Sequence, residues 1–309
     1  MLGDYLRLVR LPNIFTVPSN ILSGYFALVT LTSADALQLV LLVSSSVLLY
    51  TSGLVFNDYF DIETDIKERP YRPLPSGRIS KRIAFTIAVS SIIFGNLIAY
   101  FAAGQTGLAV SSLVSAIIIS YDYKLKKTKF GPIAMGLARS INVVLGASPA
   151  IYLILQNNNL FARMAFICLF TFAYILSISL LSRKEVQSNE DQKDLQKTIK
   201  NLRETVLICF SIIFCIIGSL IFLVVLGIFR ADLLVNLVLF LAIIITVLFR
   251  QAKFHYSSSS LQNAIKHMVI AIIVFDSMFI SGVAGLYYGL PVLTFLLPAF
   301  FLSRRLYVT

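Results

Sequence analysis

Long apolar runs are the feature that most constrains what this chain can fold into. Most of the sequence divides into apolar segments of about 20 residues, the length that a helix needs to cross a bilayer core. Hydrophobic residues make up 58% of the chain and charged residues 13%, whereas a soluble domain has about 45–50% and 25%. Backbone groups inside a bilayer must find their partners within the segment. We therefore predict an all-α integral membrane protein.

Nine apolar segments are predicted to cross the membrane, and no change in composition marks a boundary between domains. We expect residues 1–309 to form a single transmembrane domain. A shorter apolar run at 289–303 is a candidate for a tenth crossing. The nine predicted spans lie at 14–32, 37–56, 83–103, 107–121, 131–154, 161–181, 204–229, 232–250 and 266–287.

Positive charge is distributed unequally between the loops on the two sides of the predicted bundle. The net charge of +11 would suggest a nucleic-acid partner in a soluble protein, but in a membrane protein Lys and Arg concentrate in cytoplasmic loops. All of the 26 Lys and Arg residues except Arg163 and Arg230 fall on the side of the N-terminus. We predict a multi-pass protein of the cell membrane with a cytoplasmic N-terminus and no nucleic-acid partner. The sequence does not indicate an oligomeric state.

Polar residues gather where the second predicted span ends, in the stretch VFNDYFDIETD. Asn57, Asp58, Asp61 and Asp65 stand at relative positions 0, 1, 4 and 8, so on a continuous helix they share an arc of about 100°. Glu63 points to nearly the opposite side. Oxygen ligands clustered in this way suit Mg²⁺, which binds a few carboxylates together with phosphate oxygens.

The same stretch has a simpler interpretation, a solvated acidic helix end paired with the basic residues that follow it. Two observations count against this interpretation: the carboxylates share one face, and they begin at the membrane edge, where unpaired charge is costly. Arg69, Arg72 and Arg78 come next in the sequence, and guanidinium groups bind phosphate through paired hydrogen bonds. The pattern therefore favours a site for a metal ion and a phosphate group.

At these residues the chain resembles the UbiA superfamily of intramembrane prenyltransferases. NDYFDIETD matches the first aspartate-rich motif of that family, N-D-x-x-D-x-x-x-D, and RPYRPLPSGRIS is similar to the segment that follows it. The resemblance implies a bundle of nine transmembrane helices with catalytic loops on the cytoplasmic side and Mg²⁺ as the cofactor. It implies that Asp58, Asp61 and Asp65 are metal ligands, that Asn57 contacts the substrate and that Arg72 contacts its phosphates.

Other predicted site residues lie in other segments of the chain. The loop SYDYKLKKTKFGP is similar to the family's Y-x-x-x-L-K segment, which assigns Tyr121 to substrate binding and Lys126 to phosphate contact. Arg69 and Asn13 are further predicted substrate contacts. Arg139 interrupts the apolar sequence GLARSINVV. An intramembrane arginine is a candidate for function, although its side chain could instead extend to the near interface.

The second aspartate-rich motif of the family is degraded in this chain. The loop after the sixth predicted span reads LSRKEVQSNEDQKDLQKT, with Ser188 where the first aspartate belongs. Glu190, Asp191 and Asp194 still share an arc of about 100° if the loop is helical, and we predict that they bind metal. The sequences LSRKEV and GPIAMGLARSINVVLGAS are similar to one branch of the superfamily, the UbiA-like proteins encoded in Ebo gene clusters.

The intact first motif favours an enzyme. The resemblance implies a Mg²⁺-dependent prenyltransferase that moves a polyprenyl group from its diphosphate to a hydrophobic acceptor, aromatic or lipid, and releases pyrophosphate. Its catalytic residues would be Asp58, Asp61, Arg72, Lys126 and Arg139. The degraded second motif leaves an alternative open, in which a non-catalytic UbiA-like protein binds or helps to export a prenylated or diphosphate-bearing lipid.

Overall fold

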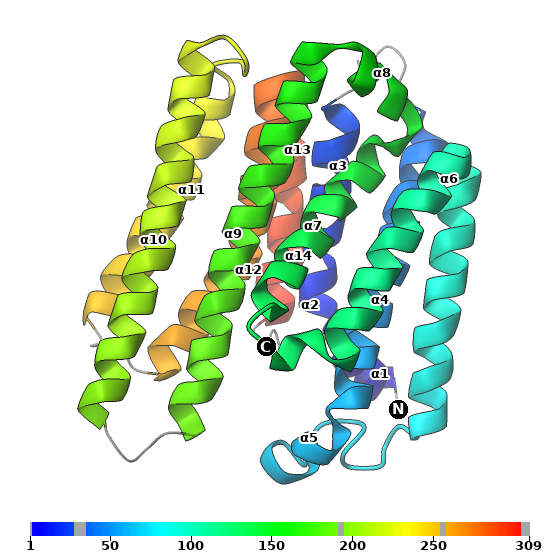
Figure 1. Cartoon of the computed structure of the whole chain (residues 1–309), viewed down its shortest axis with the longest axis vertical. Coiled ribbons are helices and arrows are strands. Elements are labelled where there is room, and N and C mark those ends of the chain that lie inside the picture. The colour runs from blue at the N-terminus through cyan, green and yellow to red at the C-terminus, as the bar shows by residue number, and fades with distance from the viewer. Residues whose placement is uncertain (1, 28–34, 191–194, 254–257, 304–309) are drawn as a thin grey trace.

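The computed structural model describes residues 2–27, 35–190, 195–253 and 258–303, and every regular element in these ranges is a helix. The long helices run side by side along the longest axis of the molecule (Figure 1). They are α4 (Ala36–Phe60), α6 (Lys81–Tyr123), α7 (Gly131–Ala147), α9 (Asn158–Glu190), α10 (Leu195–Val225), α11 (Leu233–Lys253) and α12 (Ser258–Ala284). The shorter helices are α1 (Leu2–Leu8), α2 (Leu11–Ile14), α3 (Thr16–Phe26), α5 (Ile62–Glu68), α8 (Ile151–Gln156), α13 (Leu286–Val292) and α14 (Leu296–Ser303).

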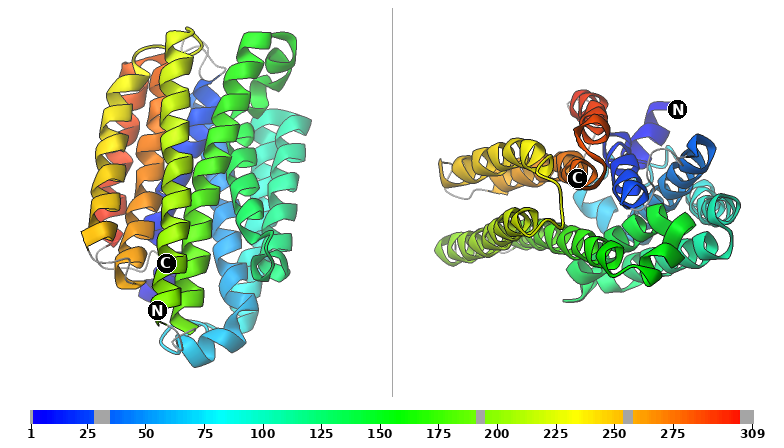
Figure 2. Two further views of the ribbon diagram at one scale, coloured as in Figure 1. Left: turned by 60° about the vertical axis from the view of Figure 1, so that its left-hand side comes forward. Right: turned by 90° about the horizontal axis from the view of Figure 1, so that it is seen from above.

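The prediction of an all-helical membrane protein is confirmed, and the span count is close to the predicted one. Eight helical stretches in the described ranges are long and apolar enough to cross a membrane. One of them, α6, doubles back on itself at Ala103 and Gly104, where the backbone leaves helical geometry and Gly104 has φ 62°. Its two arms correspond to the predicted spans at 83–103 and 107–121 and lie side by side (Figures 1 and 2).

Two predicted spans differ in detail from the helices observed. The segment 131–154 is not one helix, because α7 ends at Ala147 and a 3₁₀ turn at Ser148–Ala150 precedes α8. Pro149 in that turn has no backbone N–H and cannot continue the helical hydrogen bonding. The first predicted span, 14–32, is represented by the eleven-residue α3 and extends beyond the described residues. The candidate tenth crossing at 289–303 lies in a helical stretch, Leu286–Ser303, that qualifies as a span by length and composition.

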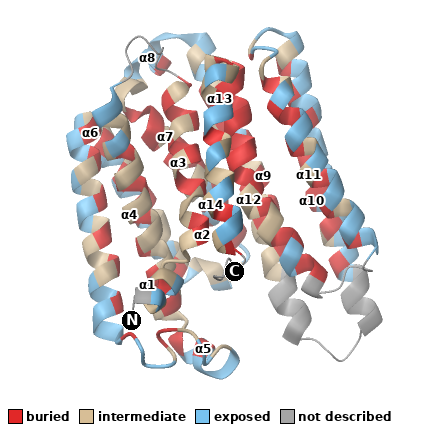
Figure 3. Cartoon of the chain, turned by 180° about the vertical axis from the view of Figure 1, so that it is seen from behind, coloured by how far each residue is buried: buried red, intermediate tan, exposed pale blue. Residues whose placement is uncertain are grey.

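Among the helices long enough to span a membrane, α12 is the most buried, and it packs against α3, α9, α11 and α13. Its side chains are largely buried, whereas outward-facing positions of the peripheral helices are exposed (Figure 3). Around α12 the core is aromatic: the ring centroids of Tyr174 and Phe275 are 4.7 Å apart, and those of Phe275 and Phe279 are 5.0 Å apart. Many exposed side chains on the outer helices are apolar, as a lipid environment requires.

Two glycines allow α3 and α7 to approach until their backbones touch. A Cβ atom at Gly24 would clash with the carbonyl oxygen of Val143, and one at Gly146 would clash with the carbonyl oxygen of Ile21. Small residues commonly permit such close helix contacts in membranes. This contact fixes the position of α3 against α7 near the C-terminal ends of both helices.

Gly146→Ala is expected to destabilise the protein by about 1–3 kcal/mol, because the added methyl group forces the two backbones apart. Gly218 on α10 is a matched control, since it is exposed and a Cβ there meets nothing within 4 Å. Gly218→Ala should leave stability unchanged or raise it slightly. Thermal unfolding in detergent measures both, and equal midpoints for the two variants would contradict the predicted contact.

Candidate functional site

The acidic motif lies at the bend between α4 and α5. α4 ends at Phe60, α5 begins at Ile62, and Asp61 between them has φ −93° and ψ 4°. The prediction that the four polar residues share the face of one continuous helix is therefore wrong, because the chain bends at Asp61 and α5 runs off at an angle to α4 (Figure 1). Asp58 and Asp65 nevertheless lie near each other, because one guanidinium group contacts both.

Arg72 makes that connection from the loop that follows α5. Its Nη1 is 2.8 Å from Oδ2 of Asp65 and 3.4 Å from Oδ1 of Asp58. Asp58 and Asp65 are 4% and 3% exposed. Burial raises the pKa of the Asp65 carboxyl, and the Arg72 guanidinium opposes part of that rise. Arg72 therefore compensates two carboxylates that have little contact with solvent.

Two further cations complete the charge balance of the motif. Arg10, between α1 and α2, places Nη2 3.0 Å from Oδ1 of Asp58. Lys126, in the 3₁₀ turn after α6, places Nζ 2.8 Å from Oδ2 of Asp61 and donates to the side-chain oxygen of Asn57 at 3.0 Å. The three carboxylates of the motif thus pair with three cations from three different segments. We call this set of ion pairs the charge clamp.

A cavity of about 370 Å³ opens beside the charge clamp and runs into the bundle. Its polar end includes Asn57 and Asp61, and its deeper walls are mainly aliphatic, with side chains such as Leu49 and Ile118. A pocket of this size with apolar walls and a few converging polar groups is typical of a small-molecule site. Its lining combines one side chain from α2 and one from α3 with others from α4, α6, α7, α9 and α12.

Arg139 lies along the cavity wall within the bundle. Its Nη2 donates to Oγ1 of Thr16 at 2.9 Å, and its guanidinium carbon lies 4.9 Å from the centroid of the Tyr50 ring. An arginine over an aromatic face gains cation–π attraction. These contacts with α3 and α4 hold the guanidinium inside the bundle, so the alternative in which it extends to the interface does not describe the structure.

Most of the predicted site residues meet at this cavity. Those that line it are Asn13, Asn57, Asp61, Arg69, Arg72, Tyr121 and Arg139. Asp58, Asp65 and Lys126 join the same site through their ion pairs. Arg78 does not: it is exposed, pairs with Asp4 at 3.1 Å and donates to the backbone carbonyl of Tyr71. Its role is to brace the loop.

The sequence interpretation missed several residues of the site. Arg10 and Asp122 line the cavity, and Asp122 is 2% exposed. Asp122 stands four residues before Lys126, a spacing that places two side chains on one helix face, and that spacing was an available signal. Arg10 had no comparable signal, because its pairing with Asp58 joins residues 48 positions apart.

The second acidic motif falls outside the described residues. Asp191 and Asp194 are among the residues not described, and of Glu190 only the backbone at the end of α9 is described. Their predicted metal binding stays a prediction. The nearby part of α9 is anchored beside the site, since Arg183 Nη1 donates to the carbonyl oxygen of Thr128 at 2.7 Å.

The first motif offers the donor atoms that Mg²⁺ prefers. Within the described ranges no three Asp, Glu, His or Cys side chains converge into a preformed metal cage. Mg²⁺ seldom uses such a cage, because it retains waters and binds one or two carboxylates together with substrate phosphates. Asp58 and Asp61 supply carboxylates of that kind, and Arg10, Arg72 and Lys126 supply the cations that a phosphate would contact. The residues present therefore fit a magnesium–diphosphate site.

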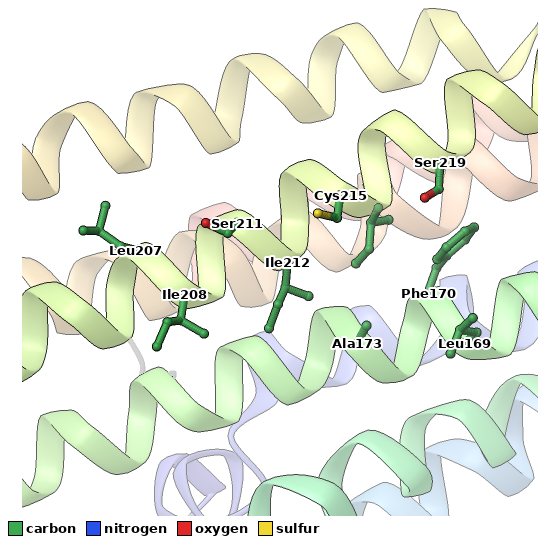
Figure 4. Close-up of a pocket in the computed structure, with 10 residues that line it drawn as sticks. Leu169, Phe170, Ala173, Leu207, Ile208, Ser211, Ile212, Cys215 and Ser219 are labelled. Carbon is green, nitrogen blue, oxygen red and sulfur yellow. The ribbon is translucent and has the colours of Figure 1, made fainter.

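A second hollow, of about 540 Å³, lies between α9 and α10 and has no comparable chemistry. Figure 4 shows Leu169, Phe170 and Ala173 of α9 on one side and Ile208 and Ile212 of α10 on the other. Its only polar side chains are Ser211, Ser219 and the thiol of Cys215. The described residues that line this hollow carry no charged group.

Sequence comparison finds one matching family and a group of archaeal relatives. The model of the UbiA prenyltransferase family matches residues 17–273. A digeranylgeranylglyceryl phosphate synthase of Metallosphaera sedula is 27% identical over 206 residues, which are 66% of this chain and 68% of that protein. A protein of the same name from Methanothrix thermoacetophila is 46% identical over 93 residues, 30% of this chain. That match spans about a third of the relative's own length, 34%.

Solved structures share the architecture at low sequence identity. A digeranylgeranylglyceryl phosphate synthase structure superposes with a TM-score of 0.65 at 21% identity, covering 92% of this chain and 98% of that one. A UbiA homolog from Archaeoglobus fulgidus bound to DMAPP and Mg²⁺ gives a TM-score of 0.61 at 16% identity, covering 94% and 99%. At these identities the likeness establishes the fold.

Proposed function

The chain belongs to the UbiA prenyltransferase family, and on that premise we propose that it transfers a prenyl group from a prenyl diphosphate to a hydrophobic acceptor. The reaction depends on Mg²⁺ and releases pyrophosphate. The observation that supports this most is the charge clamp at the mouth of an apolar cavity. The clamp suits a diphosphate and the cavity suits its hydrocarbon tail. The family match over 17–273 also supports a single catalytic domain over 1–309.

In this proposal the acidic and the basic residues of the site have different roles. Asp58, Asp61 and Asp65 hold Mg²⁺, which when bound neutralises charge on the diphosphate. The predicted acids of the second motif, Glu190, Asp191 and Asp194, contribute further ligands. When the diphosphate binds, the cations of the charge clamp exchange their contacts with carboxylate oxygens for contacts with phosphate oxygens. Lys126, Arg72 and Arg139 then stabilise the negative charge that develops on the leaving group.

The covalent step exchanges one bond for another at the first carbon of the prenyl chain. The bond from that carbon to the diphosphate oxygen breaks, and the diphosphate leaves with the electron pair. A nucleophilic atom of the acceptor forms the new bond and gives up its proton to water. The rings of Tyr50 and Tyr121 lie along the cavity, where aromatic faces stabilise a developing allylic cation. Asn13, Asn57 and Arg69 position the substrate.

The acceptor that we propose first is a prenylated glyceryl phosphate. The relatives that match at 27% and 46% identity are named digeranylgeranylglyceryl phosphate synthase, and this acceptor class is amphipathic like the cavity. We also propose that the end of the bundle with the acidic motif faces the cytoplasm in the cell membrane, from the distribution of Lys and Arg over the loops.

The test measures pyrophosphate release by the full chain in detergent with Mg²⁺ and prenyl diphosphates, across prenylated glyceryl phosphate and aromatic acceptors. Acceptor-dependent release that stops when EDTA is added and resumes with excess Mg²⁺ supports the proposal. Mg²⁺-dependent binding of the diphosphate without release in any acceptor arm would instead favour the lipid-binding alternative. Absence of both release and binding would refute the diphosphate site.

Lys126→Ala is expected to lower kcat/KM about a hundredfold, because it removes a charge that stabilises the leaving diphosphate. Lys127, the next residue, is exposed, so Lys127→Ala is the matched control and should stay near wild type. Lys126→Arg should recover part of the loss, since a cation is restored. Steady-state pyrophosphate release measures all three variants, and equal rates for Lys126→Ala and Lys127→Ala would contradict the assigned role.

A further inference from the structure

On three of its long helices, α4, α7 and the second arm of α6, the cavity stops at one level. Counting away from the charge clamp, the last lining residue is Ser46 on α4, Asn142 on α7 and Val114 on the second arm of α6. On α9 and α12 it is Ile175 and Ile272. This cavity therefore has a floor.

At the floor a chain of hydrogen bonds links three helices of the bundle. Ser46 Oγ donates to Asn142 Oδ1 at 2.6 Å, and Asn142 Nδ2 donates to Asn20 Oδ1 at 2.8 Å. All three side chains are buried, with exposures of 1%, 7% and 0%. The bonds join α4 to α7 and α7 to α3. A hydrocarbon chain passing this level would separate buried polar partners and leave them unsatisfied, which is costly.

The backbones of α3 and α7 close the space behind these hydrogen bonds. The contacts of Gly24 with Val143 and of Gly146 with Ile21 lie about one helical turn beyond Asn20 and Asn142. No side chain separates α3 from α7 there, so no ligand fits between these two helices. The floor is thus a polar surface backed by direct backbone contact.

We propose that this floor limits the prenyl donor held in the cavity to about three isoprene units, an inference that rests on the proposed function. From Asn57 to Ser46 α4 rises by eleven residues, about 16 Å at 1.5 Å per residue. An extended chain advances about 1.2 Å per bond, so an isoprene unit with four chain bonds spans about 5 Å. Three units fill the distance, and a fourth meets the floor. Ser46 and Asn142 are the specificity-determining residues.

The test measures binding of a series of prenyl diphosphates with one to four isoprene units, in detergent with Mg²⁺, by calorimetry. Wild-type affinity should rise with each unit up to three and gain nothing from the fourth. Val114→Phe raises the floor and should shift the tightest ligand to two units, lowering affinity for three units at least about tenfold. Asn142→Ala removes both hydrogen bonds and should improve the affinity for four units relative to three by about tenfold.

Ser45→Ala is the matched control for a lost buried hydrogen bond. Ser45 is as buried as Ser46 and lies beside it on α4, but its hydroxyl donates to the carbonyl oxygen of Gly95, away from the cavity. In Ser45→Ala the dependence of affinity on the number of isoprene units should equal that of wild type. A wild-type affinity that still rises from three to four units, or a Val114→Phe profile identical to wild type, would overturn the proposal while leaving the function intact. Absence of Mg²⁺-dependent binding at every length would instead refute the function itself.

Discussion

Asp61→Ala is expected to lower pyrophosphate release at least about a hundredfold at saturating Mg²⁺, as losses of key transition-state contacts do. Asp61 occupies the bend between α4 and α5, lines the cavity and pairs with Lys126 at 2.8 Å. Its removal takes away a carboxylate ligand and also leaves the ammonium group of Lys126 without its anionic partner. The variant should therefore lose Mg²⁺-dependent binding of the diphosphate along with turnover.

Glu63→Ala is the matched control for this variant. Glu63 belongs to the same acidic stretch, two residues after Asp61, and its side chain is exposed. Steady-state release and calorimetric titration with Mg²⁺ and a prenyl diphosphate should be unchanged in Glu63→Ala. If Asp61→Ala retained wild-type turnover, the metal site would have to be assigned to other carboxylates.

Arg72→Ala is expected to reduce the free energy of unfolding by about 3 kcal/mol without Mg²⁺, because removal of one partner leaves buried charge uncompensated. Among the described residues, Arg72 alone forms ion pairs with both Asp58 and Asp65. Mg²⁺ added with pyrophosphate should reduce the difference in the free energy of unfolding between Arg72→Ala and wild type, since the metal supplies positive charge to the same carboxylates.

Arg78→Ala is the control for Arg72→Ala. It shows whether the loss of any arginine from this loop destabilises the protein to the same extent. Arg78 is exposed and pairs with Asp4, and exposed ion pairs contribute about 0–1 kcal/mol. Thermal unfolding in detergent, with and without Mg²⁺ and pyrophosphate, measures both variants. Equal midpoints for Arg72→Ala and Arg78→Ala, or no response of the Arg72 variant to the ligands, would contradict the role given to Arg72.

The sequence was sufficient to predict the architecture and the polar end of the site. Apolar segments determine helical spans in a bilayer, which is why the sequence predicts the two arms of α6 as separate spans on either side of the turn at Gly104. The motif at 57–65 and the loop that follows it are contiguous in sequence, so their residues could be grouped without knowledge of the fold.

The remaining features depend on contacts between distant segments. Arg10 meets Asp58 across 48 positions, and Asn142 meets Ser46 across 96. Periodicity and motif spacing carry no information about such pairs. The bend at Asp61 was missed for a different reason: the stretch has no Gly or Pro, and the continuous polar pattern suggested an unbroken helix. At this bend Arg72, from the loop after α5, contacts Asp58 on one side and Asp65 on the other.

The charge clamp also affects how the two ligands of the site depend on each other. Each motif carboxylate already has a cationic partner, so Mg²⁺ arriving alone must displace cations that then lack an anion. A diphosphate arriving alone draws those cations away and leaves the carboxylates without cationic partners. When both arrive, every charge has a new partner. The binding of each ligand therefore strengthens the binding of the other by the same factor, and the site responds to the magnesium–diphosphate complex as one unit.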